Sequence, residues 1–183
     1  TLSPDGKYLY YVSDLAGGYG GKDIWRSERN GTQYGAPVNL GPSINTAGDE
    51  MFPYMRENGT LYFSSDGHPG FGGLDIFYAN EMEDGNWVVS NMMYPMNSNG
   101  DDFGISYISG VEKGMFSSNR GEKKGYDKLY DFELPEIEFI IEGKVSDMNG
   151  ETIGDATVRI VGDDGTNTKL KTKDILGLLL NTI

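Results

Sequence analysis

The sequence predicts an all-β protein in which one four-stranded unit is repeated along the chain, followed by a smaller β unit. Three observations predict this fold class. The phrase SDLAGGYGGKDIW at residues 13–25 recurs 52 positions later, at residues 65–77, as SDGHPGFGGLDIF. The 183 residues include 27 glycines and 12 tyrosines, which favours short strands joined by tight turns. The pairs Asn58-Gly59 and Asp84-Gly85 are hairpin signals between apolar runs.

One period of the repeat contains four predicted antiparallel strands. They are residues 50–55 (EMFPYM), 60–65 (TLYFSS), 75–80 (DIFYAN) and 86–90 (NWVVS). Inner runs such as residues 8–12 are apolar at consecutive positions, which is expected where both faces of a sheet are covered. Four strands in about 52 residues match the size and content of one β-propeller blade.

A third and weaker copy of the repeat occupies residues 115–130 (MFSSNRGEKKGYDKLY), at an offset of 53. Asn119 replaces an aspartate there, and Lys128 replaces another. We therefore expect a partial β-propeller of about three four-stranded blades over residues 1–135. Because a ring takes four to eight blades, further blades are expected upstream in the native protein.

The recurring positions are interpreted as structural. A phosphate-binding loop leads from a strand into a helix and occurs once in a sequence, whereas this loop joins two strands and recurs. Its glycines are expected to supply positive φ, and its aspartates to accept hydrogen bonds from turn N–H groups. These repeat-structural residues are Asp14, Gly20, Gly21, Asp23, Asp66, Gly72, Gly73, Asp75 and Asn119.

The phrases LSPDGKYLYYVSD and GGKDIW, with their copies NGTLYFSSDG and GGLDIFYA, resemble the TolB-type, WD-like propeller repeat of bacterial envelope proteins. The lead-in formed by Gly48, Asp49, Glu50 and Pro53, and the segment FSSNRG at residues 116–121, resemble the version abundant in Bacteroidetes. The resemblance covers about residues 1–135.

Residues 136–183 follow a different pattern. The segment EGKVSDMNGETIGDATVRIVG resembles a carboxypeptidase-regulatory-like domain, a small transthyretin- or immunoglobulin-like β-sandwich. The pattern places Gly143 and Val145 on a first strand and residues 147–150 in a turn. Inward positions on a second strand are Ile153, Ala156, Val158 and Ile160. Only 47 residues follow position 136, so the sandwich is expected to be incomplete.

The last nine residues, ILGLLLNTI, depart from the sandwich pattern. A membrane anchor needs about 20 apolar residues, roughly twice this length. We interpret the tail as the product of an altered or prematurely ended reading frame, which predicts an aggregation-prone or poorly ordered segment. The alternative is a short terminal helix or strand that covers the half-built sandwich.

The order of propeller and sandwich resembles OmpA-family envelope proteins of Bacteroidetes, including the PorE-like group of the type IX secretion machinery. The resemblance implies a periplasmic protein associated with the outer membrane, with a scaffolding or docking role toward other envelope proteins. Peptidoglycan binding is implied only through an OmpA-like domain that is absent from this chain.

Composition and motifs exclude several other classes. A net charge of −13 repels nucleic acid and anionic lipid, and the absence of cysteine excludes disulfides and thiolate metal sites. His68 lies beside Ser65 and Asp66 in one turn, not in the convergent geometry of a triad, and is expected to be a solvated loop residue outside the repeat. Residues 97–102 echo a calcium loop without its bidentate glutamate. We predict no enzyme, cofactor, metal ligand or direct membrane insertion.

Two functions remain open. The favoured one is a non-enzymatic envelope scaffold whose propeller binds protein partners through loops or its channel mouth. The alternative is a carbohydrate-binding or glycan-processing propeller module, because Tyr19 and Phe71 are placed to stack on sugar rings. Packing between neighbouring loops is the preferred interpretation of these two aromatics.

Overall fold

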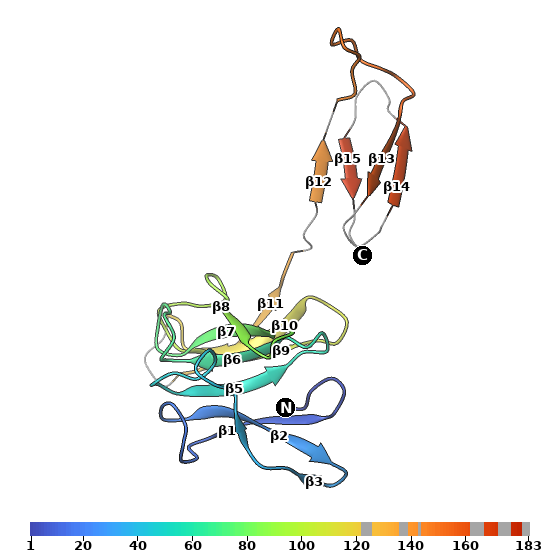
Figure 1. Cartoon of the computed structure of the whole chain (residues 1–183). Coiled ribbons are helices and arrows are strands. Elements are labelled where there is room, and N and C mark those ends of the chain that lie inside the picture. Colours follow the sequence, from blue (N-terminus) through green and yellow to red (C-terminus); the bar gives the residue numbers. More distant parts are fainter. Residues whose placement is uncertain (122–125, 136–138, 143, 162–166, 172–176, 181–183) are drawn as a thin grey trace. The chain divides into compact units, whose positions relative to one another are not determined.

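The computed structural model describes residues 1–121, 126–135, 139–142, 144–161, 167–171 and 177–180. These residues form strands and turns, and no helix occurs among them. The chain divides into two compact units, Thr1–Leu134 and Pro135–Ile183 (Figure 1). All strand pairs described are antiparallel, so the predicted all-β class is confirmed.

The first unit contains three sheets, which we call the first, middle and third sheet. The first sheet consists of β1 (Tyr8–Ser13), β2 (Asp23–Asn30), β3 (Gln33–Tyr34) and β4 (Val38–Asn39). The middle sheet consists of β5 (Glu50–Met55), β6 (Leu61–Ser65), β7 (Asp75–Glu81) and β8 (Trp87–Asn91), paired in that order. The third sheet consists of β9 (Asp102–Tyr107), β10 (Lys113–Ser118) and β11 (Lys128–Glu133). The middle strands agree with the predicted strands to within one residue at each end.

The first strand of the middle sheet and that of the third sheet each carry a bulge. Pairing of β5 with β6 shifts between Met51 and Tyr54, and Phe52 there has a positive φ of 56°. Pairing of β9 with β10 shifts at the equivalent place, where Gly104 has a φ of 66°. The left-handed residue kinks each strand, and glycine in the third sheet adopts it without the steric penalty that Phe52 carries.

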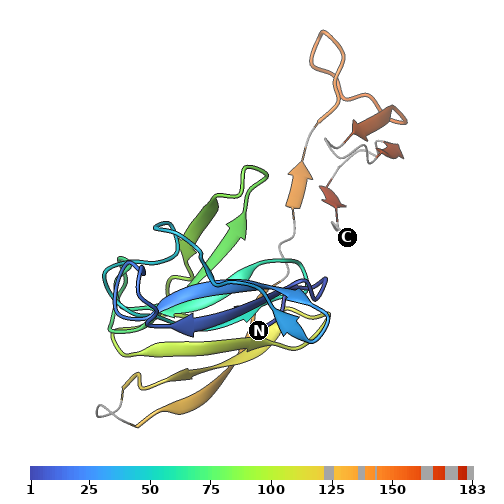
Figure 2. The same ribbon diagram turned by 60° about the horizontal axis from the view of Figure 1, so that its bottom comes forward.

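The three sheets are layered face to face, and each gap between them holds a hydrophobic core (Figures 1 and 2). Because side chains alternate along a strand, Leu61 and Phe63 of β6 enter the core shared with the first sheet. Tyr62, between them, enters the core shared with the third sheet. Phe63 and Ile76, one in each core, are fully buried. Coverage of both faces therefore explains the consecutive apolar residues of the inner strands.

The second unit contains two pairs of strands. β12 (Phe139–Glu142) pairs with β15 (Gly177–Leu180), and β13 (Thr157–Val161) pairs with β14 (Asn167–Lys171). Residues 177–180 of the tail thus form a strand, the alternative interpretation of that segment. The predicted turn is confirmed, because Gly150 donates to the Asp147 carbonyl at 3.1 Å with a φ of 85°.

Two predictions for the second unit are wrong in detail. Val145 lies outside any strand, and Ile153 is exposed rather than inward. The reason for the second is Asp155, whose φ of 56° interrupts the extended backbone before β13 begins. The alternation holds after that point: Val158 and Ile160 are half-buried. Gly143 lies outside the described residues.

The layered core predicts the effect of one substitution. Phe63→Ala should lower the free energy of unfolding by about 3–5 kcal/mol, because it removes a fully buried ring from a filled core. Leu129→Ala is the matched control, since Leu129 on β11 is 73% exposed and its loss should change stability by less than about 0.5 kcal/mol. Urea unfolding measures both values. Equal effects of the two substitutions would contradict the placement of Phe63.

Candidate functional site

The first and middle sheets are each joined to the next sheet by a buried asparagine, at the end that carries the glycine-rich loop. Asn45, in the segment leading into β5, accepts the Ile24 N–H at 2.8 Å and donates to the Ile24 carbonyl at 3.0 Å. Asn97 makes the same two bonds to Ile76, both at 2.8 Å. Each carboxamide thus bonds to the backbone of β2 or β7 as a neighbouring strand would, and the isoleucine carbonyl also accepts the N–H of Leu40 or Met92. We call the two copies of this arrangement the inter-sheet joints.

A second asparagine and an aspartate complete each joint. Asn45 donates to the Asn39 side chain at 2.8 Å, and Asn39 donates to Asp23 at 2.7 Å. Asp23 also accepts the N–H groups of Tyr19 and Gly20, the loop residues that precede it. One chain of bonds therefore runs from the glycine-rich loop through two asparagines to the backbone of β2.

The second joint differs from the first in one bond. Asp75 accepts the N–H groups of Phe71 and Gly72 at 2.8 and 3.0 Å, both through its Oδ2 atom. Asn97 still donates to Asn91, but Asn91 donates to the Pro69 carbonyl instead of to the aspartate. The Oδ1 atom of Asp75 is consequently buried without a hydrogen-bond partner in the described part of the chain. Burial raises the pKa of this carboxyl.

The glycines of the loop serve a purpose other than the predicted one. Gly17 has a φ of 95°, as predicted, but Gly20, Gly21, Gly72 and Gly73 do not have positive φ, so the prediction is wrong for these four. They are required because the loop lies against the segment leading into the next sheet. A Cβ atom on Gly20 would overlap the carbonyl oxygens of Thr46 and Gly48, and one on Gly72 would overlap that of Gly100. Gly21 and Gly73 also donate to the carbonyls of Gly48 and Gly100.

Asp66 and Asn119 bind the lead-in of their own sheet. Asp66 accepts the Asp49 N–H at 2.7 Å, and Asn119 accepts the Asp101 N–H at 2.7 Å. Their partners thus lie 17 and 18 residues earlier in the chain, not in the adjacent turn as predicted. Asp14, the counterpart in the first sheet, is exposed and has no hydrogen-bond partner among the described residues.

Two fully buried carboxylates lie behind these contacts. Glu50 accepts bonds from the Thr46 N–H, the Thr46 hydroxyl and the Ser65 hydroxyl. Asp102 accepts equivalent bonds from Ser98 and Ser118, and a further bond from the Arg120 guanidinium at 2.7 Å. In the part of the chain that the structure describes, no three His, Cys, Asp or Glu residues are grouped so that they can hold a metal ion.

His68 is half-buried and hydrogen-bonded, so the prediction of a solvated loop residue is wrong. Its Nε2 donates to the Ile44 carbonyl at 2.8 Å, and its ring lies 5.0 Å from that of Phe77. Arg120 makes the equivalent bond in the third sheet, donating to the Met96 carbonyl. Its guanidinium lies over Phe116, as the imidazole lies against Phe63.

Sequence reasoning assigned no role to Asn45 and Asn97, and it did not identify the hydrogen bonds of His68 and Arg120. The signal was present, because Ile44 and Asn45 lie 52 positions before Met96 and Asn97. The partners in each joint are 21 residues apart along the chain, so no local pattern identifies the contact.

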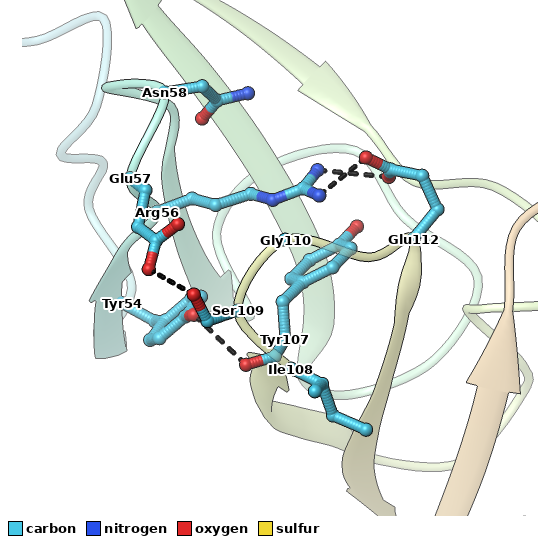
Figure 3. Close-up of a pocket in the computed structure, with 9 residues that line it drawn as sticks. All are labelled: Tyr54, Arg56, Glu57, Asn58, Tyr107, Ile108, Ser109, Gly110 and Glu112. Atoms are coloured by element: carbon cyan, nitrogen blue, oxygen red, sulfur yellow. Dashed lines mark hydrogen bonds and ion pairs between the residues drawn. The ribbon is translucent and has the colours of Figure 1, made fainter.

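The opposite, hairpin end of the middle and third sheets forms a pocket of about 480 Å³ (Figure 3). It lies between the turn joining β5 to β6 and the turn joining β9 to β10. Its lining residues are Tyr54, Arg56, Glu57, Asn58, Tyr107, Ile108, Ser109, Gly110 and Glu112. These two turns occupy the same place in successive repeats, and their residues were not singled out from the sequence.

The pocket is organised around an arginine that stacks on a tyrosine. The Arg56 guanidinium lies 4.0 Å from the centre of the Tyr107 ring and donates to Glu112. Its hydrogen bonds to Glu112 raise the pKa of Arg56, and burial raises the pKa of Tyr107. Ser109 donates to Glu57 at 2.6 Å across the pocket. Such a surface offers aromatic faces, hydroxyls and neutralised charges for non-covalent binding.

Aromatic side chains are also exposed at the other end of the sheets. Tyr19 and Phe71, on equivalent glycine-rich loops, are 52% and 50% exposed, so packing between loops covers only half of each. Phe52 and Phe103 stack with ring centres 4.9 Å apart, and Phe52 is 43% exposed. These rings are the second candidate surface for recognition.

Neither the models of known protein families nor the sequences of curated proteins match this chain. Across the described residues, no helix is long and apolar enough to cross a membrane.

The close approach at the joints predicts that Gly72→Ala is strongly destabilising. A methyl group there overlaps the Gly100 carbonyl, so the two loops must separate, and we expect a loss of about 2–4 kcal/mol in the free energy of unfolding. Gly35→Ala is the matched control, because its Cβ meets only atoms of Glu28, the nearest being the carbonyl oxygen at an ordinary 3.6 Å. Denaturant unfolding compares them, and equal effects would show that the loop has room to relax.

The buried carboxyl predicts a pH dependence. Because the pKa of Asp75 is raised, the folded chain holds this proton more tightly than the unfolded chain does. The contribution of Asp75 to the free energy of unfolding therefore falls as the pH rises through its folded-state pKa. Asp75→Asn stays neutral, so its stability relative to the parent chain should increase as the pH rises above about 3.9, the ordinary pKa of aspartate, and level off above the folded-state pKa of Asp75.

Unfolding in denaturant at several pH values measures this difference, and a value independent of pH would refute it. Asp23→Asn is the control. Both oxygens of Asp23 accept hydrogen bonds, so an amide there faces donors. That variant should lose about 1–3 kcal/mol at neutral pH.

Proposed function

We propose that the first unit is part of a β-propeller whose three sheets are successive blades, and that it acts as a non-enzymatic scaffold that binds protein partners. The blade arrangement is supported by the 52-residue repeat, the β5-β6-β7-β8 strand order and the face-to-face layering. We extend the proposal to the second unit as a partial transthyretin- or immunoglobulin-like sandwich, on the basis of its alternating pattern.

One observation supports the binding role: the residues that recur between the repeats lie in the buried joints, whereas the residues at the hairpin ends do not recur. The recurring polar residues, such as Asn45 and Asp23, bond to the backbone of the sheets and are buried. The hairpin residues differ between the repeats: the positions of Arg56 and Glu57 in one turn are occupied by Ile108 and Ser109 in the next. Side chains that the joints do not need are thus free to recognise a partner.

The hairpin pocket has the composition expected of a protein-binding surface. Tyrosine and arginine dominate the energetics of protein interfaces, and Tyr54, Tyr107 and Arg56 lie together there. Exposed Ile108 adds an apolar contact at the rim. A peptide loop with polar and aromatic groups matches this surface better than a strongly charged ligand, because Arg56 is already paired with Glu112.

The setting that we propose is the periplasm, at the outer membrane, with other envelope proteins as partners and a link to type IX secretion. This part of the proposal is supported by the resemblance of the repeat phrases.

The alternative is a carbohydrate-binding or glycan-processing propeller module. The half-exposed rings of Tyr19 and Phe71 favour it, because they recur on equivalent loops and stacking on sugar rings needs such faces. The two functions use opposite ends of the sheets, so variants can separate them.

Capture of partners from cross-linked envelopes by the intact protein tests the proposal. Glu57→Lys combined with Ile108→Glu alters exposed pocket residues, and Tyr19→Ala combined with Phe71→Ala is the matched variant at the loop end. We expect a protein captured by the parent chain to be reduced about tenfold or more by the pocket variant and unchanged by the loop variant. Enrichment of polysaccharide that only the loop variant abolishes would overturn the scaffold in favour of the alternative.

A further inference from the structure

The Arg56 guanidinium is the flat surface around which the hairpin pocket is built. Its Nη1 and Nη2 atoms both donate to the Glu112 carboxylate, and Nη2 also donates to the Val111 carbonyl. Guanidinium N–H groups lie in the plane of the group, so these bonds fix its orientation and neutralise its charge. An anion gains little from an arginine that is already paired. The faces of the guanidinium remain suited to stacking.

One face of this guanidinium rests on Tyr107. The Arg56 Cζ atom lies 4.0 Å from the centre of the Tyr107 ring. Tyr54 lies nearly parallel to that ring, at an interplanar angle of 13°, and donates its hydroxyl to the Tyr107 carbonyl. Phe132 meets the same ring edge-on, with 5.0 Å between the ring centres. Tyr107 is therefore held in place from several sides. Because Arg56 covers its face, a sugar ring cannot stack there.

The other face of the guanidinium is turned toward the pocket. Figure 3 shows the Tyr107 ring on one side of the Arg56 side chain and Asn58 on the other. The Asn58 Oδ1 atom accepts the Thr60 N–H at 3.1 Å, whereas its Nδ2 group has no acceptor among the described residues. Glu57, beside it in the turn, is exposed. The space between Arg56 and Asn58 is thus bounded by a flat cation and has a donor and an acceptor at its rim.

The residues of this stack do not recur in the repeat. The positions 52 residues before Arg56 and Tyr107 are occupied by Pro4 and Met55. Met55 is buried in the core between the first and middle sheets. Two sheets can therefore be joined without an arginine stacked on a tyrosine at these positions, and the pair is left to serve recognition.

We propose that the hairpin pocket binds an aromatic side chain of the protein partner, with its ring on the open face of the Arg56 guanidinium. The cation then lies between two rings, that of Tyr107 and that of the partner, and each ring attracts it. An aromatic side chain also loses little conformational freedom when it is inserted, because it has only two rotatable bonds. The inference rests on the proposed function, since it names the residue that the partner inserts.

Titration of the full chain with N-acetyl-tyrosinamide, followed by NMR, tests the proposal without a partner. We expect saturable binding with a dissociation constant of about 1 mM, as suits a probe of this size. The Arg56 Nε–H signal should shift upfield, because a proton over the face of an aromatic ring is shielded. N-acetyl-leucinamide has an apolar side chain without a ring and should bind at least about tenfold more weakly. Equal affinities for the two probes would contradict the proposal.

Two matched variants locate the probe. Arg56→Lys keeps the positive charge beside Glu112 but removes the planar face, so it should weaken binding of N-acetyl-tyrosinamide at least about fivefold. Arg29→Lys makes the same change at an exposed arginine outside the pocket and should leave binding as it is in the parent chain. Backbone amide shifts show whether each variant is folded. If Arg56→Lys is not, the upfield shift of Arg56 in the parent chain decides the question.

Binding by Arg56→Lys as tight as that of the parent chain would overturn the proposal, and so would a parent chain that shows no saturable binding or no shift of Arg56. Capture of protein partners is a separate measurement. Probe binding without any captured protein would reject the scaffold function alone, and captured protein without probe binding would reject the aromatic anchor alone.

Discussion

The stack of sheets depends on one interaction, the pairing of a buried asparagine carboxamide with both backbone groups of an isoleucine on the preceding sheet. Ile24 and Ile76 are fully buried, and neither their N–H nor their carbonyl can reach water. A buried backbone group left without a partner costs about 1–3 kcal/mol. The isoleucine carbonyls also accept the N–H groups of Leu40 and Met92, so the isoleucine N–H is the group in each joint that depends on the asparagine. Asn45 and Asn97 satisfy both groups with a single side chain, because a carboxamide has a donor and an acceptor side by side.

The rest of the joint follows from that pairing. Holding the asparagine in place brings the lead-in segment of one sheet against the glycine-rich loop of the sheet before it. Only glycine fits where Gly20 meets Thr46 and Gly48. The aspartate then organises the loop through its N–H groups. The repeated phrase is thus a connector between sheets, and the hairpin ends are left to vary in sequence and to supply a binding surface.

Strands and turns of the middle sheet were predictable because the hairpin signals and the apolar runs are local. The functions of individual repeat residues were less so. Gly72 was expected to need positive φ, but it is needed for space, which depends on a segment almost 30 residues away. His68 was expected to be solvated, yet it donates to the Ile44 carbonyl as Arg120 donates to the Met96 carbonyl in the third sheet. The sequence does not reveal this likeness, because a histidine and an arginine have only a hydrogen-bond donor in common. In the second unit, a single left-handed residue, Asp155, shifted the start of β13.

The central claim is that the hydrogen bonds between the asparagines and the isoleucines resist local opening as strongly as the hydrogen bonds between the strands do. Native-state hydrogen exchange of the Ile24 and Ile76 amides is the most direct measurement. Both amides donate to an asparagine side chain and to no strand. They should exchange only on global unfolding, with the same free energy as the central amides of β6. Exchange through local fluctuations, at the rates of the surrounding loops, would contradict this account.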